Sequence, residues 1–119
     1  MNAIRLADKL ELFSDTWSPR IIAELNGQQV KLAKLEGEFV WHAHADEDEL
    51  FYVIEGELIM RLRDRDVTLQ AGDLFVVPRG VEHSPYAPKG ASVMLFEPAR
   101  TKHTGGVEDE RTVHDQPWI

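Results

Sequence analysis

Hydrophobic and polar residues alternate in short runs along most of this 119-residue chain, with turn-forming residues between the runs. A period of two places successive side chains on opposite faces of a strand, so each run predicts a strand. The predicted strands span residues 20–25, 28–35, 38–44, 50–54, 57–63, 67–69, 74–77 and 91–96. Many short strands separated by turns are typical of an all-β sandwich or barrel.

The strongest local signal is the dipeptide Asn26-Gly27 between the first two runs. Both residues tolerate positive φ angles, which the type I′ turn of a two-residue hairpin requires. In the second run Val30 and Leu32 alternate with Gln29 and Lys31. We therefore expect one face of this strand to be buried, the face of Val30 and Leu32.

The two ends of the chain depart from the strand pattern. Residues 3–13 carry apolar side chains at loose helical spacing, with Asn2 as the predicted cap and Pro19 as a stop. Periodicity disappears after residue 98, although the last three residues, 117–119, are apolar and are expected to dock on this barrel or on a partner. The sequence thus divides into an N-terminal helix and connector (1–19), a β-domain (20–98) and an irregular C-terminal tail (99–119).

Length and charge limit the function. A chain of 119 residues forms one domain with one core. Its net charge of −8 argues against nucleic-acid and anionic-membrane partners, which require basic surfaces. No apolar run approaches the roughly 20 residues of a membrane span, and no signal-peptide core is visible, so we expect a cytoplasmic protein. The chain has no cysteine, so any metal ligands must be His, Asp or Glu.

Two histidines in the predicted strand 38–44 carry the first candidate chemistry. His42 and His44 are two residues apart, and in a strand this spacing points both imidazoles to the same face. On a helix they would diverge by about 200° and could not share a ligand. The aromatic and β-branched residues just before His42 favour the strand.

A carboxylate lies close by, at the start of the strand that ends at the turn glycine Gly56. Glu49 begins this apolar run, and alternation along it turns Glu49 and Phe51 inward. Asp48 is the alternative ligand, but alternation turns its side chain the other way. Two imidazoles and one carboxylate suit a first-row divalent metal.

The first motif of the cupin superfamily of small β-barrels resembles this stretch. That motif runs glycine, spacer, His-x-His, Glu and glycine, and its places are taken here by Gly37, His42, His44, Glu49 and Gly56. The spacer between Gly37 and His42 has four residues instead of the motif's five.

The second cupin motif resembles residues 72–83, which read as a turn, a short apolar strand, a tight turn and a histidine. Its places are taken by Gly72, Pro78, Gly80 and His83. Ala87 stands where the motif has asparagine, which removes a side-chain hydrogen-bonding group and leaves the ligands intact. The resemblance extends from Lys31 to about Glu97 and is nearest to small single-domain type-2 cupins.

The resemblance implies an all-β fold, the double-stranded β-helix or jelly-roll barrel, with a short N-terminal helix and an irregular tail. It implies one divalent transition metal ion per chain, held by His42, His44, Glu49 and His83. Manganese, iron, nickel, copper and zinc all suit such a thiolate-free set. The alternative is a barrel that holds water among the imidazoles, which is costly unless each imidazole finds a partner.

Two function classes remain open at this stage. One is a metal-dependent enzyme of isomerase, dioxygenase or lyase type, acting on a small oxygen-rich metabolite. The other is a non-catalytic cupin that binds a small molecule as a sensor or carrier. Either would use a cavity for which the candidate lining residues are Phe51, Phe75, Tyr86 and Met94. No residue shows a spacing that assigns it a catalytic role.

A homodimer is expected for two reasons. Small cupins that this chain resembles commonly pair through sheet edges. The N-terminal segment, with Trp17, Ile21 and Ile22, also carries more apolar surface than a lone barrel of this size requires.

Overall fold

In the computed structural model, residues 1–99, 105 and 116–119 are described, and these residues form one short helix and six strands. The helix is α1 (Leu6–Leu10). The strands are β1 (Arg20–Leu25), β2 (Gln28–Glu38), β3 (Glu49–Leu62), β4 (Asp66–Gln70), β5 (Leu74–Val77) and β6 (His83–Pro98).

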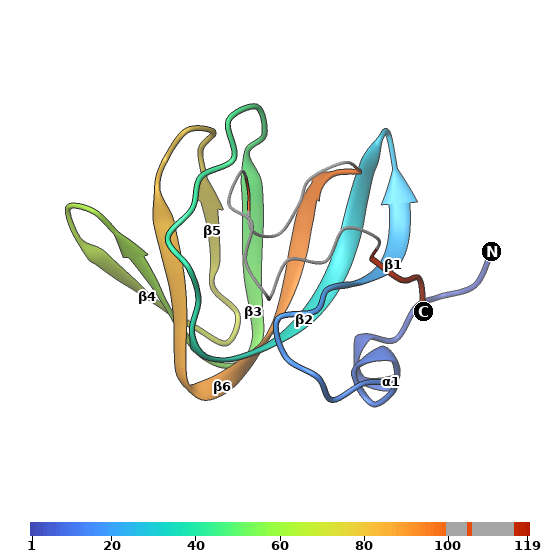
Figure 1. The fold of residues 1–119 in the computed structure, drawn as a ribbon. Helices are drawn as coiled ribbons and strands as arrows, with labels where there is room; N and C mark the ends of the chain where they lie inside the picture. Colours follow the sequence, from blue (N-terminus) through green and yellow to red (C-terminus); the bar gives the residue numbers. More distant parts are fainter. Residues whose placement is uncertain (100–104, 106–115) are drawn as a thin grey trace.

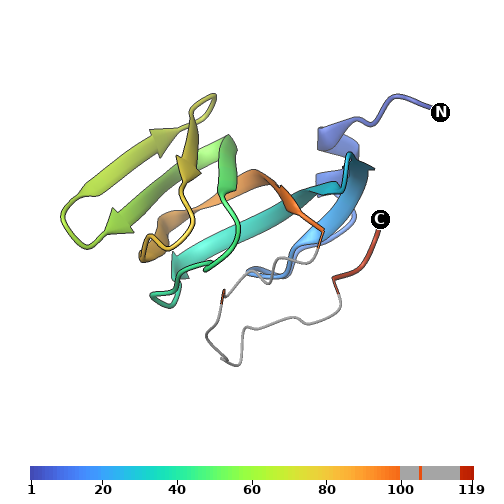
Figure 2. The same cartoon turned by 90° about the horizontal axis from the view of Figure 1, so that it is seen from above.

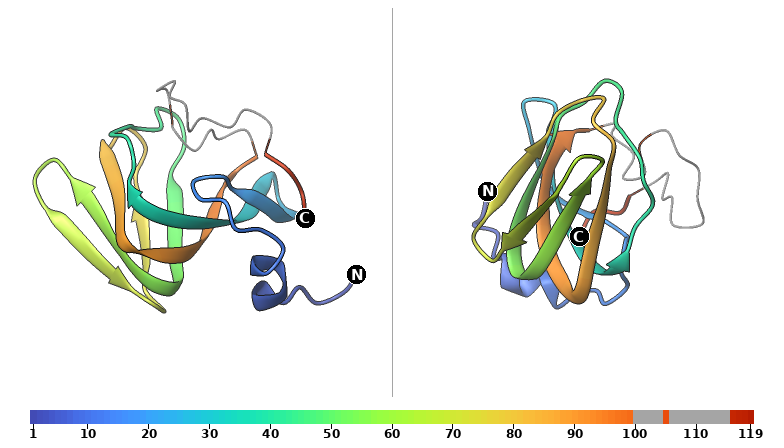
Figure 3. Two further views of the ribbon diagram at one scale, coloured as in Figure 1. Left: turned by 60° about the horizontal axis from the view of Figure 1, so that its bottom comes forward. Right: turned by 90° about the vertical axis from the view of Figure 1, so that its left-hand side faces the viewer.

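All strand pairs are antiparallel and belong to one curved sheet, in the order β1-β2-β6-β3-β4, with β5 paired to β3. The long strands β3 and β6 bend as they cross the molecule, and β6 runs between β2 and β3 (Figures 1 and 3). Buried apolar side chains from β2, β3, β4, β5 and β6 fill one core cluster. The all-β jelly-roll prediction is confirmed.

The Asn26-Gly27 hairpin is also confirmed, because both residues have positive φ angles, 50° and 76°. The prediction that β2 buries only the face of Val30 and Leu32 is wrong. Lys31 and Gln29 are buried as well, with 1% and 8% of their surfaces exposed. Both faces of β2 are covered, one by the N-terminal segment and the other by the interior of the curved sheet.

The N-terminal helix is shorter than predicted, and Asn2 is not its cap. Arg5 precedes the first helical residue, and no side chain caps the helix. The segment is held instead by Leu10 and Phe13, which pack against Ile22 and Leu32. A helix this short is stabilised by the burial of its apolar side chains against the sheet, not by a capping side chain.

Several predicted strand boundaries are wrong, and the last strand begins at His83, not at Ala91 as predicted. The sheet strand β3 continues through Gly56, whose φ of 85° accompanies shifts of register against β6. A Cβ atom at Gly56 would collide with the carbonyl oxygen of Gly90, so a close approach between strands explains this glycine. The predicted strand 38–44 is an extended segment outside the regular sheet, since β2 ends at Glu38 and only His42 forms a single bridge, to His83.

The last residues of the chain dock on β1 of the same molecule. The Ile21 N–H donates to the Pro117 carbonyl (2.8 Å), and the Ile119 N–H donates to the Ile21 carbonyl (3.1 Å). The Lys9 ammonium donates to the Ile119 carbonyl oxygen (2.8 Å). Figure 2 shows both chain ends on this side of the molecule. Residues 100–104 and 106–115 of the predicted tail, which include His103 and His114, lie outside the described residues.

Within the described residues, no helix combines the length and the apolar character that crossing a bilayer demands.

Candidate metal centre

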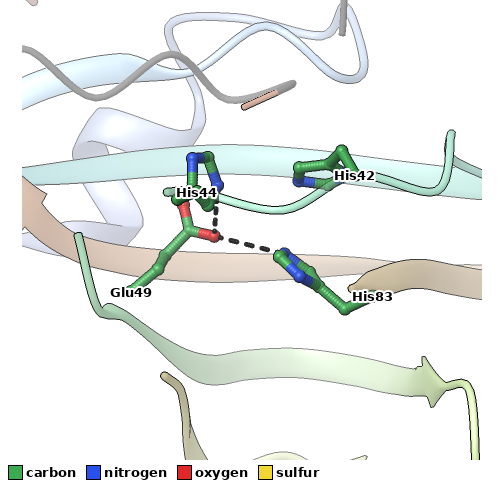
Figure 4. A group of neighbouring side chains, drawn as sticks. All are labelled: His42, His44, Glu49 and His83. Atoms are coloured by element: carbon green, nitrogen blue, oxygen red, sulfur yellow. Dashed lines mark ion pairs between the residues drawn. The ribbon is translucent and has the colours of Figure 1, made fainter. Parts of the chain in front are cut away.

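Three separate segments bring four titratable side chains together. His42 and His44 come from the extended segment 39–48, Glu49 from the first position of β3 and His83 from the first position of β6. Figure 4 shows the three imidazoles and the carboxylate facing one another. Donor atoms of the four residues all lie within 4.8 Å of one another. The four residues that the cupin motifs implied as ligands are therefore brought to one point.

Backbone hydrogen bonds fasten segment 39–48 in place. His42 and His83 exchange both N–H···O=C bonds (3.0 and 2.9 Å), and the Gly80 N–H donates to the His44 carbonyl (2.8 Å). Burial alternates along this segment, with Trp41 and Ala43 partly exposed and the two histidines buried. The two-residue spacing thus aligns the imidazoles, as predicted, although the segment is not a regular strand.

The four side chains are almost completely buried, with 3% of His42, 4% of His44, 2% of Glu49 and no part of His83 exposed. The Oε1 atom of Glu49 lies 3.3 Å from Nε2 of His44 and 3.7 Å from Nε2 of His83. Two imidazoles therefore lie beside one carboxylate oxygen, and a ring nitrogen of His42 lies within 4.8 Å of the donor atoms of the other three residues.

Backbone carbonyls set the orientation of two of the imidazoles. Nδ1 of His42 lies 2.9 Å from the Val40 carbonyl oxygen, and Nδ1 of His83 lies 2.9 Å from that of Val81. A carbonyl only accepts, so each Nδ1 carries the hydrogen and each Nε2 presents its lone pair to the centre. This is the tautomer that a metal-binding histidine uses when its other nitrogen is fixed by a second group.

The inward-facing atoms have no hydrogen-bond partner in the described protein. They are Nε2 of His42, His44 and His83, and Oε1 of Glu49. Leaving a buried polar atom unpaired costs about 1–3 kcal/mol. Three nitrogen donors and one carboxylate oxygen that converge without partners fit a first-row divalent metal ion, which would bond to all four.

Protonation states at this centre also suit a cation. Burial, followed by the electrostatic influence of the neighbouring His83, lowers the pKa of His42 from 6.5 to about 4, so its imidazole is neutral at pH 7. Burial alone would raise the pKa of Glu49. The neighbouring side chains of Glu97, His44 and His83 outweigh this effect and hold the pKa of Glu49 well below its usual value. His42 therefore offers a neutral imidazole and Glu49 an ionised carboxylate, the forms that bind metals.

The alternative carboxylate, Asp48, faces away from the centre. Half of its side chain is exposed, and it accepts hydrogen bonds from the Arg79 backbone N–H (2.8 Å) and the Arg79 guanidinium (3.3 Å). Alternation along the chain explains why Glu49 and not Asp48 faces the centre, because Glu49 and Phe51 are buried while Leu50 between them is partly exposed.

A cavity of about 30 Å³ adjoins the centre. His42 and Glu49 supply its ionisable side chains, and all other lining residues are apolar: Trp17, Pro19, Ala33, Leu35, Phe39, Phe51, Pro85, Val93 and Leu95. Trp17 and Phe39 stack with ring centroids 4.4 Å apart. The sequence did not identify Trp17 as a cavity residue, because Trp17 lies in a connector without a repeating pattern. Its positive φ angle of 57° is likewise not indicated by any local pattern.

Of the four predicted pocket residues, Phe51 lines this cavity. Phe75 packs against the main core, and Met94 packs with the cluster beneath the N-terminal helix. Tyr86 lies under the Arg61 guanidinium, 5.3 Å from its ring centroid. A substrate contact by Phe75, Met94 or Tyr86 stays a prediction. The neighbours of these three side chains do not support it.

Comparisons with known proteins agree with this geometry. The sequence model of the Cupin domain family matches residues 28–97. The crystal structure of a cupin-2 domain containing protein from Shewanella frigidimarina is 55% identical, with a TM-score of 0.79 over 80% of this chain and 93% of that one.

Curated relatives share a shorter stretch. Bacillus subtilis YdbB is 44% identical over 63 residues, which are 52% of this chain and 56% of that protein. A 3-hydroxyanthranilate 3,4-dioxygenase from Brucella anthropi is 35% identical over 60 residues, 44% of this chain and 33% of the enzyme. The chain thus spans about half or less of the length of these two relatives.

The low pKa of His42 predicts a pH dependence for the metal-free protein. Unfolded chains take up a proton at this residue near pH 6.5, whereas the folded protein does so only near pH 4. Stability from this group is therefore complete above pH 6.5 and is lost as the pH falls toward 4. At about 1.4 kcal/mol per pH unit, the unfolding free energy should drop by about 2 kcal/mol between pH 7 and pH 5.

Urea unfolding of the metal-free protein at both pH values measures this loss, with His42→Asn as the control that cannot titrate. The difference between wild type and control isolates the His42 contribution. An equal pH dependence in both proteins would contradict the assignment.

Proposed function

The chain belongs to the Cupin domain family, and from that premise we propose that it is a metal-dependent enzyme that acts on a small oxygen-rich molecule. One observation carries the proposal: the four buried donor atoms of His42, His44, Glu49 and His83 converge without hydrogen-bond partners among the described residues. When bound, a divalent ion supplies a Lewis acid with open coordination positions for oxygen ligands. Manganese, iron, nickel, copper and zinc all suit this donor set.

Among isomerase, dioxygenase and lyase types, the dioxygenase type has the most support. Two relatives that are 35% identical over 60 and 65 residues of this chain are named 3-hydroxyanthranilate 3,4-dioxygenases. The apolar cavity beside His42 and Glu49 also suits a substrate with an apolar part, such as an aromatic ring. The small volume of the cavity limits the size of the substrate that can bind unless the cavity wall rearranges.

A second candidate is a non-catalytic cupin that binds a small molecule as a sensor or carrier. The observation that favours it is the cavity lining, in which no ionisable side chain other than His42 and Glu49 is present among the described residues. General acid–base catalysis requires a titratable group within reach of the substrate.

The metal proposal predicts that protein purified without added metal contains about one divalent ion per chain by elemental analysis. Glu49→Ala should lower Co²⁺ affinity by more than about 100-fold, because removing even an outer-shell partner of a metal ligand costs 10–100-fold. Asp48→Ala is the matched control and should bind Co²⁺ like wild type, since Asp48 faces solvent. Loss of the ion only in Asp48→Ala would overturn the ligand assignment.

Oxygen uptake separates catalysis from binding. We expect the Fe²⁺-loaded protein to consume dioxygen with 3-hydroxyanthranilate or catechol as probes, and His44→Ala to consume none. Asp48→Ala should retain the wild-type rate. Saturable binding of a probe by wild type without oxygen uptake would favour the second candidate.

We also propose that the protein forms a homodimer, through a different surface from the one the sequence suggested. The N-terminal argument was wrong, because Trp17 lines the cavity while Ile21 and Ile22 are buried within their own chain.

A better candidate is the outer face of β5, β3 and β6. Tyr52 and Leu74 are cross-strand neighbours there, and Leu50 lies between Val76 and Phe96. Leu74 and Val76 are 59% and 45% exposed. A contiguous apolar face of this kind is typical of a subunit interface.

Light scattering at micromolar concentration should give a mass of two chains for wild type and one chain for Val76→Asp, because a buried charge at the interface is costly. Leu12→Asp is the control, since Leu12 is 63% exposed and outside this face. A wild-type mass of one chain would remove the dimer proposal.

A further inference from the structure

The connector between α1 and β1, residues 11–19, supplies part of the wall of the cavity beside the metal centre. Trp17 and Pro19 come from this connector, whereas the other lining residues belong to the sheet or to segment 39–48. Among the described residues that line the cavity, Trp17 alone is partly exposed, and the others are buried. The indole of Trp17 therefore lies at the boundary between the cavity and solvent.

Two hydrogen bonds to β2 hold Trp17 in this place. Its backbone N–H donates to the Lys34 carbonyl (2.8 Å), and its indole N–H donates to the Glu36 carbonyl (2.9 Å). Both acceptors belong to one strand of the sheet, so the backbone and the side chain of Trp17 are fixed relative to the same strand. The indole is thus a held part of the cavity wall.

The indole also contacts a ring that adjoins the metal centre. It stacks on Phe39, with an angle of 13° between the ring planes and 4.4 Å between the centroids. The Phe39 ring in turn meets the His42 imidazole edge to face, with centroids 5.5 Å apart. Both geometries are favourable for aromatic pairs. The wall that Trp17 forms therefore extends, through one ring, to a candidate metal ligand.

Core packing alone does not explain a tryptophan at this position. The φ angle of Trp17 is 57°, in the left-handed region that bulky residues rarely adopt and glycine adopts readily. Among the described residues other than glycine, only Trp17 and Asn26 have a positive φ, and the hairpin turn accounts for Asn26. Residues kept in such a conformation cluster at ligand-binding sites. The backbone of Trp17 therefore favours a role in ligand binding.

We propose that Trp17 is a specificity-determining residue: its indole admits oxygen ligands with a small apolar part, such as catechol, and excludes those that carry a further bulky apolar group. This inference rests on the proposed function, in which a small oxygen-rich molecule binds beside the metal. The cavity is small, and lining residues such as Ala33, Val93 and Leu95 are buried in the sheet. A bulkier ligand therefore finds room only where the indole now lies.

The test compares catechol with 4-tert-butylcatechol, two bidentate oxygen ligands that differ by one bulky apolar group. Both are titrated by calorimetry into the full-length, Zn²⁺-loaded protein, because Zn²⁺ has no redox chemistry. The measured quantity is the ratio of the two dissociation constants, which does not change when a variant weakens both ligands equally. Wild type should bind catechol about tenfold more tightly or better, since even one methylene group that a pocket cannot accommodate costs this much.

Trp17→Gly removes the indole and also relaxes the backbone, because glycine adopts a φ of 57° without strain. This variant should bind 4-tert-butylcatechol at least as tightly as catechol. Trp17→Phe keeps a smaller ring beside Phe39, so its ratio should lie between those of wild type and Trp17→Gly, and it carries the test if Trp17→Gly does not fold. Trp118→Gly is the matched control and should discriminate like wild type, since Trp118 is 55% exposed and does not line the cavity.

Three results would overturn the inference. If wild type binds both ligands equally, or if the Trp17 variants that fold discriminate as strongly as wild type, Trp17 does not limit ligand size, and the proposed function stands. If Trp118→Gly loses discrimination as Trp17→Gly does, the effect does not come from the cavity wall. If the Zn²⁺-loaded wild type binds neither ligand, the proposed function falls and this inference falls with it.

Discussion

The structure depends on one constraint: polar atoms that are buried must be paired. Three imidazole nitrogens and a carboxylate oxygen point at one another in the interior, and none has a protein partner among the described residues. Such an arrangement is unfavourable in the protein alone and becomes favourable when a cation bonds to all four atoms. The same burial that makes unpaired polar atoms costly also keeps His42 neutral, the form that binds a metal ion.

The fold fixes the ligand residues through backbone contacts on the side away from the centre. His42 and His83 are joined through their backbones, and each imidazole is held by a carbonyl two residues earlier in the chain. Glu49 begins a strand that is paired on both sides, to β5 and to β6. Because three segments converge, no single one forms the site, and the curvature of β3 and β6 is what brings their first residues together.

The sequence predicted the parts of this arrangement that depend on local spacing. The two-residue spacing of His42 and His44, the alternation that turns Glu49 inward and the Asn26-Gly27 turn are all local features, and the structure confirms their geometry. The strand predicted for residues 38–44 is absent, because after β2 ends the segment forms a single bridge, from His42 to His83. The residue that forms this bridge is distant in the sequence, so the local pattern does not reveal it.

Features set by distant partners could not be predicted in this way. Lys31 looks like a solvent-facing residue in an alternating strand, and its burial depends on Glu97, 66 residues later. Trp17 enters the cavity from a connector that has no repeating pattern. Tyr86 and Met94 are predicted to line the pocket, but alternation in β6 buries Ala87, Val93 and Leu95 more deeply than Tyr86 and Met94.

The most direct test of the account is X-ray absorption spectroscopy of the Zn²⁺-loaded protein. We predict a first shell of nitrogen and oxygen at about 2.0–2.2 Å, with the outer-shell scattering of three imidazole rings. A shell of oxygen atoms alone, without imidazole scattering, would contradict the claim that these three histidines and Glu49 hold one ion.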